Sequence, residues 1–258
     1  MKSILITGAS GFIGKALCTD LGQTCKVTGI YHRNRPADGL PASLELADIT
    51  DSQAVASLFR RVVPDVVIHC AAIAHQHIGA VDKASYLRVN SESTESIAKA
   101  AYESNPKVLF IFLSSVSVYG ENNLQVPVTE AHACRPTSDY GLSKLNAEQR
   151  LASLPGIPGS NLPVILRLAP VYDRVWGGNL DRRVLSPFNL SYVTFGSGRQ
   201  QMSALARPNL VDFINFLARP ANRTPREDRV FNVCSANYQR KQSLLQIEEL
   251  ELLEHFRV

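Results

Sequence analysis

Short apolar runs alternate with segments of helical periodicity over the first two thirds of the chain. Runs made almost entirely of apolar residues are typical of strands that are buried on both faces. We expect strands at residues 3–7, 26–30, 65–72, 108–113 and 164–169, and a short one from residue 44. We expect helices at residues 15–21, from Thr50 or Asp51 through Phe59, at 84–102, and from a cap at Ser138 or Asp139 to about residue 154. This alternation predicts an α/β fold with a Rossmann-like doubly wound parallel sheet.

The pattern changes after Pro170. A glycine-rich loop with the only tryptophan occupies residues 171–180. Beyond it we expect a strand at 191–195, a helix at 209–217, a strand at 229–233 and a final helix at 243–256. We therefore expect two domains, a Rossmann domain over residues 1–170 and a smaller substrate-binding domain over residues 171–258. The second domain is expected to cover the edge of the sheet where ligands bind.

The loop between the first strand and the first helix is rich in glycine. Residues 8–14 read Gly-Ala-Ser-Gly-Phe-Ile-Gly, a G-x-x-G-x-x-G pattern. Glycines allow a sharp turn and a close approach to a pyrophosphate, and the helix N-terminus offers free N–H groups to its negative charge. We therefore predict a dinucleotide site, with contacts from Gly8, Ser10, Gly11, Phe12, Ile13 and Gly14.

The end of the second strand indicates which dinucleotide binds. A dinucleotide-binding fold usually places an Asp or Glu there, which binds the ribose hydroxyls of adenosine. This chain has Tyr-His-Arg-Asn-Arg at residues 31–35, without an acid. Arg33 and Arg35 suit a 2′-phosphate, so we predict that they and His32 bind NADP(H), with NAD(H) as the alternative. The competing interpretation is that both arginines are merely solvated.

Other strand ends supply further expected contacts. Asp48, followed by Ile49, is placed to reach the adenine amino group. Ala71 and Ala72 end the fourth strand, where small residues let the backbone approach a ligand. We expect His75 or His77 to line the substrate cleft. The histidines at 69, 75 and 77 match no helix-borne metal-binding pair, so we predict no metal site.

Three residues form a candidate proton-transfer group. Tyr140 and Lys144 are four residues apart, which places them one turn apart on one face of a helix. A nearby ammonium favours the phenolate, so we expect the pKa of Tyr140 to fall toward neutrality. Ser115 ends a central strand, where its hydroxyl would bind a substrate oxygen. A serine nucleophile is disfavoured because no G-x-S-x-G elbow is present.

Composition narrows the class of protein. The 258 residues are 45% hydrophobic and 19% charged, which is ordinary for a globular protein, and the net charge is +4. This mild charge argues against nucleic acid and suits a phosphorylated small molecule. The five cysteines are odd in number and form no C-x-x-C pair, so we expect reduced thiols and a cytoplasmic protein. No apolar run reaches the length of a membrane span.

Several motifs occur in one order along the whole chain. They are Thr-Gly-Ala-Ser-Gly-Phe-Ile-Gly at 7–14, Asp-Ile-Thr at 48–50, Ser-Ser at 114–115 with Val-Tyr-Gly at 118–120, Tyr-Gly-Leu-Ser-Lys at 140–144 with Glu148, Arg-Leu-Ala-Pro-Val-Tyr at 167–172 and Asn-Leu-Val-Asp-Phe at 209–213. This combination resembles the extended short-chain dehydrogenase/reductase family, the nucleotide-sugar epimerases and dehydratases.

The resemblance implies roles for individual residues. Tyr140 would be the general acid/base, Lys144 would hold the nicotinamide ribose, and Ser115 would orient the sugar hydroxyl. It implies hydride transfer between sugar C4 and a nicotinamide, with Asn179 at the nucleotide diphosphate. The helices at about 84–104 and 139–154 build dimers in relatives, which implies a homodimer.

The chain departs from the family pattern in three places. It lacks the acid after the second strand. The family's phosphate-binding Arg is replaced by residues 200–203, so Arg199 or Arg207 would have to substitute. Relatives also run on for several dozen residues, so the substrate domain looks shortened.

Three functions remain open from the sequence. The favoured one is an NADP(H)-dependent reductase of a nucleotide-linked 4-keto sugar. The second is a 4-epimerase or dehydratase with recycled NAD. The third is a non-catalytic cofactor-binding or regulatory protein.

Overall fold

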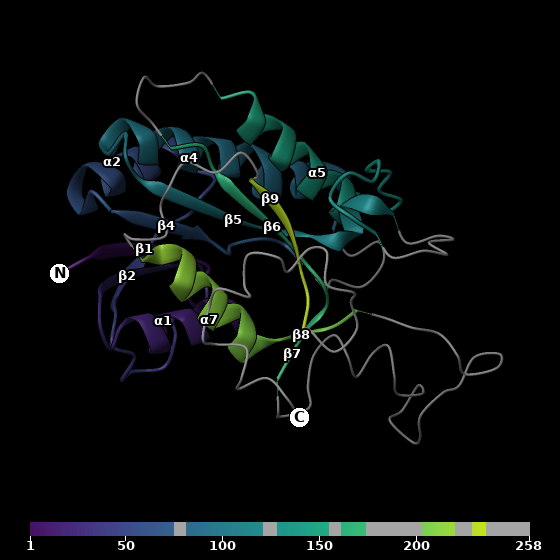
Figure 1. Cartoon of the computed structure of the whole chain (residues 1–258). Helices are drawn as coiled ribbons and strands as arrows, with labels where there is room; N and C mark the ends of the chain where they lie inside the picture. The colour runs from purple at the N-terminus through teal and green to yellow at the C-terminus, as the bar shows by residue number, and fades with distance from the viewer. Residues whose placement is uncertain (75–80, 121–127, 155–160, 174–202, 220–228, 236–258) are drawn as a thin grey trace.

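The chain is built around one large parallel sheet. The computed structural model describes residues 1–74, 81–120, 128–154, 161–173, 203–219 and 229–235 (Figure 1). The sheet has seven strands in the order β3-β2-β1-β4-β5-β6-β9, and every neighbouring pair is parallel. Its strands are β1 (Ser3–Thr7), β2 (Lys26–Tyr31), β3 (Ser43–Leu46), β4 (Val66–His69), β5 (Leu109–Ser115), β6 (Val164–Leu168) and β9 (Val230–Val233). The strand order reverses between β1 and β4, so the expected doubly wound Rossmann-like fold is confirmed.

Helices cover both faces of this sheet. They are α1 (Phe12–Leu21), α2 (Ser52–Val62), α3 (Lys83–Leu87), the π-helical segment η1 (Arg88–Glu92), α4 (Ser93–Ser104), the 3₁₀ turn η2 (Val116–Tyr119), α5 (Asp139–Ala152) and α7 (Arg207–Ala218). Figure 1 shows α1 and α7 on one face and α2, α4 and α5 on the other. A separate two-stranded sheet pairs β7 (Val171–Tyr172) with β8 (Leu205–Ala206).

The apolar runs are continuous because alternate residues enter two different cores. Ile4 and Ile6 pack in the core beneath α1 and α7, whereas Leu5 packs in the core beneath α2, α4 and α5. In β5, Phe110 and Phe112 likewise face the second core. Successive side chains of a strand point to opposite faces, so both sets have to be apolar.

Two expected helices begin at the capping residues that the sequence indicated. Asp51 accepts hydrogen bonds from two N–H groups in the first turn of α2, and Ser138 accepts one from Gly141 in α5. The expected helix at 84–102 is present, but it is interrupted by the π-helical segment around Asn90. The first helix begins at Phe12 rather than at Lys15, directly within the glycine-rich loop.

Two elements that we expected in the second domain are part of the Rossmann-like fold, β9 as a strand of the large sheet and α7 as a helix on one of its faces (Figure 1). β9 pairs with β6, with Ile165 opposite Val230, and extends the sheet by one strand. α7 packs beside α1 through Leu210 and Ile214, which share a core with Leu17. Most of the remaining 171–258 region lies outside the described residues, so the domain division at residue 170 stays a prediction. Within the described residues, no helix is long and apolar enough to cross a membrane.

Candidate active site

The glycine-rich loop forms a bare backbone cradle at the carboxyl end of β1. Gly8 has φ of +72°, and a Cβ there would lie 2.8 Å from the amide nitrogen of Ala71. A Cβ on Gly14 would lie 2.1 Å from the carbonyl oxygen of Gly8. Gly11 caps α1 without a side-chain hydrogen bond, so the N–H groups of the first turn have no side-chain partner there. The cradle therefore fits a pyrophosphate, which these N–H groups and the helix dipole would bind.

The other predicted loop residues lie on the same turn. Ser10 is exposed, Phe12 is 47% exposed, and Ile13 is partly buried against the core under α1. Arg207 contacts Phe12 in two ways. Its guanidinium lies over the Phe12 ring, 4.3 Å from the centroid, and donates to the Phe12 carbonyl oxygen at 3.1 Å. The same guanidinium is paired with Asp173. Arg207, one of the two expected substitutes for the family's arginine, thus lies beside the glycine cradle.

The ends of β2 and β3 bring His32 and Asp48 together. His32 Nε2 lies 3.7 Å from Asp48 Oδ2. Asp48 Oδ1 accepts hydrogen bonds from the backbone N–H and the hydroxyl of Thr50, at 2.9 and 2.8 Å. The backbone hydrogen bond is the largest cause that lowers the pKa of Asp48, so this carboxylate stays ionised at neutral pH. Ile49 follows it, partly buried in the core under α2.

The two predicted phosphate-binding arginines are exposed beyond β2. Arg33 is exposed, and Arg35 Nη2 lies 3.8 Å from Asp38 Oδ1 in a pair whose side chains are 65% and 96% exposed. Such an exposed pair contributes little to stability and does not hold Arg35 in place. The basic stretch is therefore accessible beyond the end of β2, and its role stays a prediction.

A buried asparagine fixes the chain where it leaves β4. Asn90 is fully buried in the π-helical segment, and its side chain accepts from the N–H of Ile73 at 2.8 Å and donates to the Ile73 carbonyl oxygen at 3.0 Å. Upstream, the N–H of Ala71 donates to the hydroxyl of Thr7 at 3.1 Å. Ala71 and Ala72 are thereby held beside Gly8. Asn90 lies within the helix expected at 84–102, and nothing in its local sequence indicates its partners. Single π turns in helices are frequent at functional sites.

Ser115 and Tyr140 meet at the carboxyl end of β5. The hydroxyl of Ser115 forms a hydrogen bond with the Tyr140 phenol. Ser115 Oγ also accepts from the N–H of Ser117 at 3.2 Å, which fixes the start of the following 3₁₀ turn. The Tyr140 ring lies in the first turn of α5 and packs edge-on against Tyr86, with ring centroids 6.5 Å apart. The structure therefore brings the two hydroxyls together as the sequence predicted.

Lys144 lies one turn further along α5 and is buried. Only 3% of it is exposed, its Nζ donates to the carbonyl oxygen of Leu113 at 2.8 Å, and its ammonium lies 4.7 Å from the Phe112 ring centroid. Burial lowers the pKa of Lys144 to about 8.

The expected acidification of Tyr140 is wrong for this structure. The pKa of Tyr140 is raised to about 12, first because the phenol is desolvated by burial, and the hydrogen bond with Ser115 offsets only part of that. The Lys144 ammonium is not among the groups that shift this pKa, and it donates a hydrogen bond to the Leu113 carbonyl oxygen. The phenol is therefore protonated at neutral pH.

A buried ion pair, which the motif analysis left without a role, supports the Tyr140 helix. Glu148 lies one turn after Lys144 and is bound by both Nε and Nη2 of Arg167, at 3.1–3.2 and 2.7 Å. Ser114 donates to Glu148 at 2.5 Å, and Arg167 Nη1 donates to the Tyr119 hydroxyl at 2.7 Å. In the sequence, a role for Glu148 is indicated by its spacing of four residues from Lys144 and eight from Tyr140, which places all three on one helix face.

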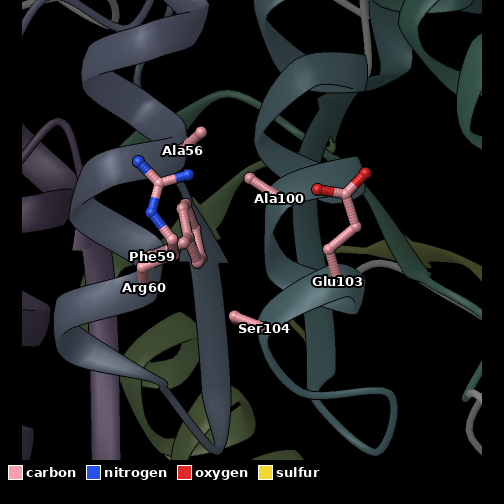
Figure 2. Close-up of a pocket in the computed structure, with 6 residues that line it drawn as sticks. All are labelled: Ala56, Phe59, Arg60, Ala100, Glu103 and Ser104. Atoms are coloured by element: carbon pink, nitrogen blue, oxygen red, sulfur yellow. The ribbon is translucent and has the colours of Figure 1, made fainter.

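Several predicted site residues lie outside the described residues, namely His75, His77, Asn179 and Arg199. Among the residues that the structure describes, no group of three or more His, Cys, Asp or Glu side chains is placed to hold a metal ion. A pocket between α2 and α4, shown in Figure 2, is lined by Ala56, Phe59, Arg60, Ala100, Glu103 and Ser104. It lies toward the C-terminal ends of these two helices, away from the carboxyl ends of the strands.

The chain is similar to proteins of known activity over most of its length. Residues 4–234 match the model of the NAD dependent epimerase/dehydratase family. The chain is 34% identical over 222 residues to a UDP-glucose 4-epimerase of Vibrio cholerae, an alignment that covers 83% of this chain and 65% of that protein. It is 30% identical over 173 residues to dTDP-glucose 4,6-dehydratase 1 of Escherichia coli, covering 56% of this chain and 48% of that protein. It therefore spans less than two thirds of these relatives.

Other similarities concern a subunit protein and solved structures. The chain is 29% identical over 179 residues to methionine adenosyltransferase 2 subunit beta of Rattus norvegicus, covering 67% of this chain and 48% of that protein. The UDP-glucose 4-epimerase of Thermotoga maritima with UDP-glucose superposes with a TM-score of 0.74 at 23% identity, covering 99% of this chain and 84% of that one. UDP-glucuronic acid 4-epimerase from Bacillus cereus, in complex with UDP-glucuronic acid and NAD, gives 0.71 at 26% identity with the same coverage.

The family match spans the glycine cradle, the Ser115–Tyr140 pair and the whole described sheet. The chain belongs to the NAD dependent epimerase/dehydratase family, within the extended short-chain dehydrogenases/reductases.

Proposed function

We propose that this chain catalyses NAD(P)-dependent oxidation or reduction at C4 of a nucleotide-linked sugar. The observation that carries the proposal is the hydrogen-bonded Ser115–Tyr140 pair beside buried Lys144, at the same sheet edge as the glycine cradle. A hydroxyl pair next to a dinucleotide site is the arrangement that a carbinol–ketone interconversion needs, since a proton must move as a hydride is transferred. The relatives named for nucleotide-sugar chemistry support the choice of substrate class.

The residues present fit a nicotinamide dinucleotide. Gly8, Gly11 and Gly14 would hold its pyrophosphate, and Asp48 would face its adenine. When bound, the cofactor supplies or accepts the hydride. Lys144, one helical turn from Tyr140, is placed to hold the nicotinamide ribose once its ammonium leaves the Leu113 carbonyl.

Tyr140 is placed to transfer the proton that accompanies the hydride transfer. A phenol with a pKa of about 12 carries its proton at neutral pH and is ready to donate it to a sugar carbonyl oxygen. Ser115 would hold that oxygen through its own hydroxyl. In the reverse direction the same phenol, once deprotonated, would accept the proton of the sugar hydroxyl.

The basic stretch after β2 supports NADP(H) as the cofactor. Arg33 and Arg35 are exposed, and residues 31–35 contain no acid to bind an unmodified ribose. NADP(H) is the usual choice of an enzyme that consumes reducing equivalents, and we therefore favour a 4-keto-sugar reductase. The relatives named as 4-epimerases and dehydratases, and the neighbour solved with NAD, keep recycled NAD as the second candidate.

Cofactor titration tests the preference. We expect NADPH to bind more tightly than NADH, and Arg33→Ala or Arg35→Ala to weaken NADPH binding by about 10- to 100-fold while leaving NADH binding unchanged. Arg60→Ala, which changes an exposed arginine at the pocket between α2 and α4, is the matched control and should change neither affinity. Equal or tighter binding of NADH by the unaltered protein would contradict the NADP(H) proposal.

Turnover separates the reductase from the epimerase. A reductase mixed with NADPH and a 4-keto nucleotide sugar consumes the reduced cofactor in proportion to product, whereas an epimerase interconverts UDP-glucose and UDP-galactose without net consumption. Cofactor that co-purifies with the protein and resists dialysis would favour the epimerase. If the protein with bound cofactor shows neither activity on any of several nucleotide sugars, both the reductase and the epimerase proposals are excluded.

A non-catalytic role is the candidate from another class. The similarity to a protein named as a subunit of methionine adenosyltransferase motivates it. Under this alternative, Tyr140→Phe changes nothing, whereas it abolishes turnover under either enzymatic proposal. A homodimer built through α4 and α5 is proposed as well, and sedimentation equilibrium tests it. The expected cytoplasmic location stays a prediction.

A further inference from the structure

A buried chain of hydrogen bonds runs from the end of β1 to the π-helical segment. His69 is 1% exposed, and its Nδ1 lies 2.6 Å from the hydroxyl of Thr7, while its Nε2 lies 2.9 Å from the hydroxyl of Thr94. Thr94 in turn donates to the carbonyl oxygen of Asn90 at 2.8 Å, and Thr7 accepts from the N–H of Ala71 at 3.1 Å. Four hydrogen bonds therefore link four elements that surround the candidate site.

The direction of every bond in this chain follows from its two ends. The Thr94 hydroxyl has one proton and donates it to the Asn90 carbonyl oxygen. Its oxygen must therefore accept a hydrogen bond from the N–H at Nε2 of His69. Nδ1 then has no proton and accepts from the hydroxyl of Thr7, whose oxygen accepts from Ala71. The chain is complete only with a neutral His69 that is protonated at Nε2.

Each end of the chain leads to a different half of the site. Thr7 precedes Gly8, whose tight turn packs against the backbone of Ala71. At the other end, the side chain of Asn90 donates to Ser143 Oγ at 3.0 Å, and Ser143 donates to the carbonyl oxygen of Tyr140 at 2.8 Å. Hydrogen bonds through His69 thus connect the glycine cradle with the first turn of α5.

We propose that His69 is a positioning residue that holds the glycine cradle and the Tyr140 helix in register through its two hydrogen-bonded ring nitrogens. It touches neither substrate nor reacting atoms, and it acts through Thr7 on one side and through Thr94 and Asn90 on the other. The expected change in turnover rests on the proposed function. The expected change in dinucleotide affinity does not, because binding is measured without turnover.

The surroundings of the ring support this role. His69 stacks on Phe112 with ring centroids 5.8 Å apart and an interplanar angle of 22°, which fixes the plane of the imidazole. Burial first, and then the nearby Lys144 ammonium, lower the pKa of His69 to about 3, so the ring is neutral wherever the enzyme works. A neutral imidazole that is stacked on Phe112 and has both nitrogens bonded has one orientation and one tautomer.

Two substitutions separate the two halves of the chain. His69→Asn keeps an acceptor near Nδ1 and should retain dinucleotide affinity within about twofold, while kcat falls roughly tenfold or more because the Thr94 arm is lost. His69→Gln keeps a donor near Nε2 and should retain kcat better, while the dinucleotide Kd rises by roughly tenfold. Thr94→Val should reproduce the first variant, and Thr7→Val the second.

The matched control is His132→Gln. His132 also bonds a threonine, through Thr129 at 3.0 Å, but it lies on the polar loop before α5 and should change neither quantity. Nitrogen-15 shifts of the His69 ring should show the neutral Nε2–H form from about pH 5 to pH 8.

The proposal is overturned if all four variants lower the melting temperature yet leave dinucleotide Kd and kcat unchanged in the folded state, or if the ring is protonated at Nδ1. If no nucleotide sugar is turned over even by the unaltered protein, the proposed function fails, whereas the split in dinucleotide affinity between His69→Asn and His69→Gln still supports or refutes the positioning role.

Discussion

At the scale of single residues, the buried polar side chains in the described part of the chain are nearly all hydrogen-bonded. His69, Asn90 and Lys144 each have their partners, which is what the cost of burying a bare polar group requires. The sequence showed which residue types gather at the strand ends, but it did not show their partners. The pKa of Tyr140 is the clearest case, because it depends first on burial, which helical spacing does not reveal.

Tyr102 is the exception within the described residues, because its buried hydroxyl has no hydrogen-bond partner. We predict that Tyr102→Phe leaves stability unchanged or raises the free energy of unfolding by up to about 1–3 kcal/mol, since the unsatisfied group is removed and the ring packing on Phe110 is kept. Tyr119→Phe is the matched comparison. Its hydroxyl binds Arg167 and Asn232, and its loss should cost about 1.5–3 kcal/mol. Equal destabilisation in urea unfolding would contradict this account.

His69 should make the protein sensitive to acid. Its pKa is about 3 in the folded chain and about 6.5 when unfolded, so only the unfolded chain binds the proton between these values. Stability from this residue is therefore present above about pH 6.5 and falls with acidification, by up to about 1.4 kcal/mol per pH unit. Unfolding of wild type and His69→Asn at several pH values measures it. The variant should show a shallower slope, and identical slopes would refute the prediction.

At the scale of elements, α5 organises the site from one helix face. Tyr140, Lys144 and Glu148 follow one another at intervals of a turn, and the first meets Ser115, the second the Leu113 carbonyl and the third Ser114 and Arg167. The existence of α5 and its Ser138 cap were predictable, because capping and periodicity are local. The π-helical turn at Asn90 was not, because it depends on side chains that reach Ile73 and Ser143 from distant parts of the chain.

The Glu148–Arg167 pair should matter far more to stability than an exposed pair. We predict that Arg167→Met costs about 3–5 kcal/mol of unfolding free energy, because it leaves Glu148 buried without its partner. Lys99→Met, which breaks an exposed pair with Glu95 on α4, should cost less than about 0.5 kcal/mol. Chemical denaturation of both variants compares the two. A small cost for Arg167→Met would show that α5 is held by its apolar contacts instead.

At the scale of the whole molecule, the topology gathers the site at one edge of the sheet. Parallel strands end on the same side, so the cradle after β1, the chain after β4 and Ser115 on β5 converge there (Figure 1). The doubly wound fold was predictable from alternating apolar runs and helices. The place of β9 was not, because a four-residue strand joins β6 by a pairing between residues 65 positions apart, from Ile165 to Val230. That strand also supplies Asn232 to the Tyr119 hydroxyl.

The central claim is that Tyr140 is the proton donor beside a bound nicotinamide dinucleotide. The most direct measurement compares wild type with Tyr140→Phe for both dinucleotide affinity and kcat with a 4-keto nucleotide sugar, using Tyr102→Phe as the control. We predict that Tyr140→Phe lowers kcat by about 10²- to 10⁴-fold and keeps the dinucleotide Kd within about twofold. A Tyr140→Phe variant that turns over at the wild-type rate would contradict the account.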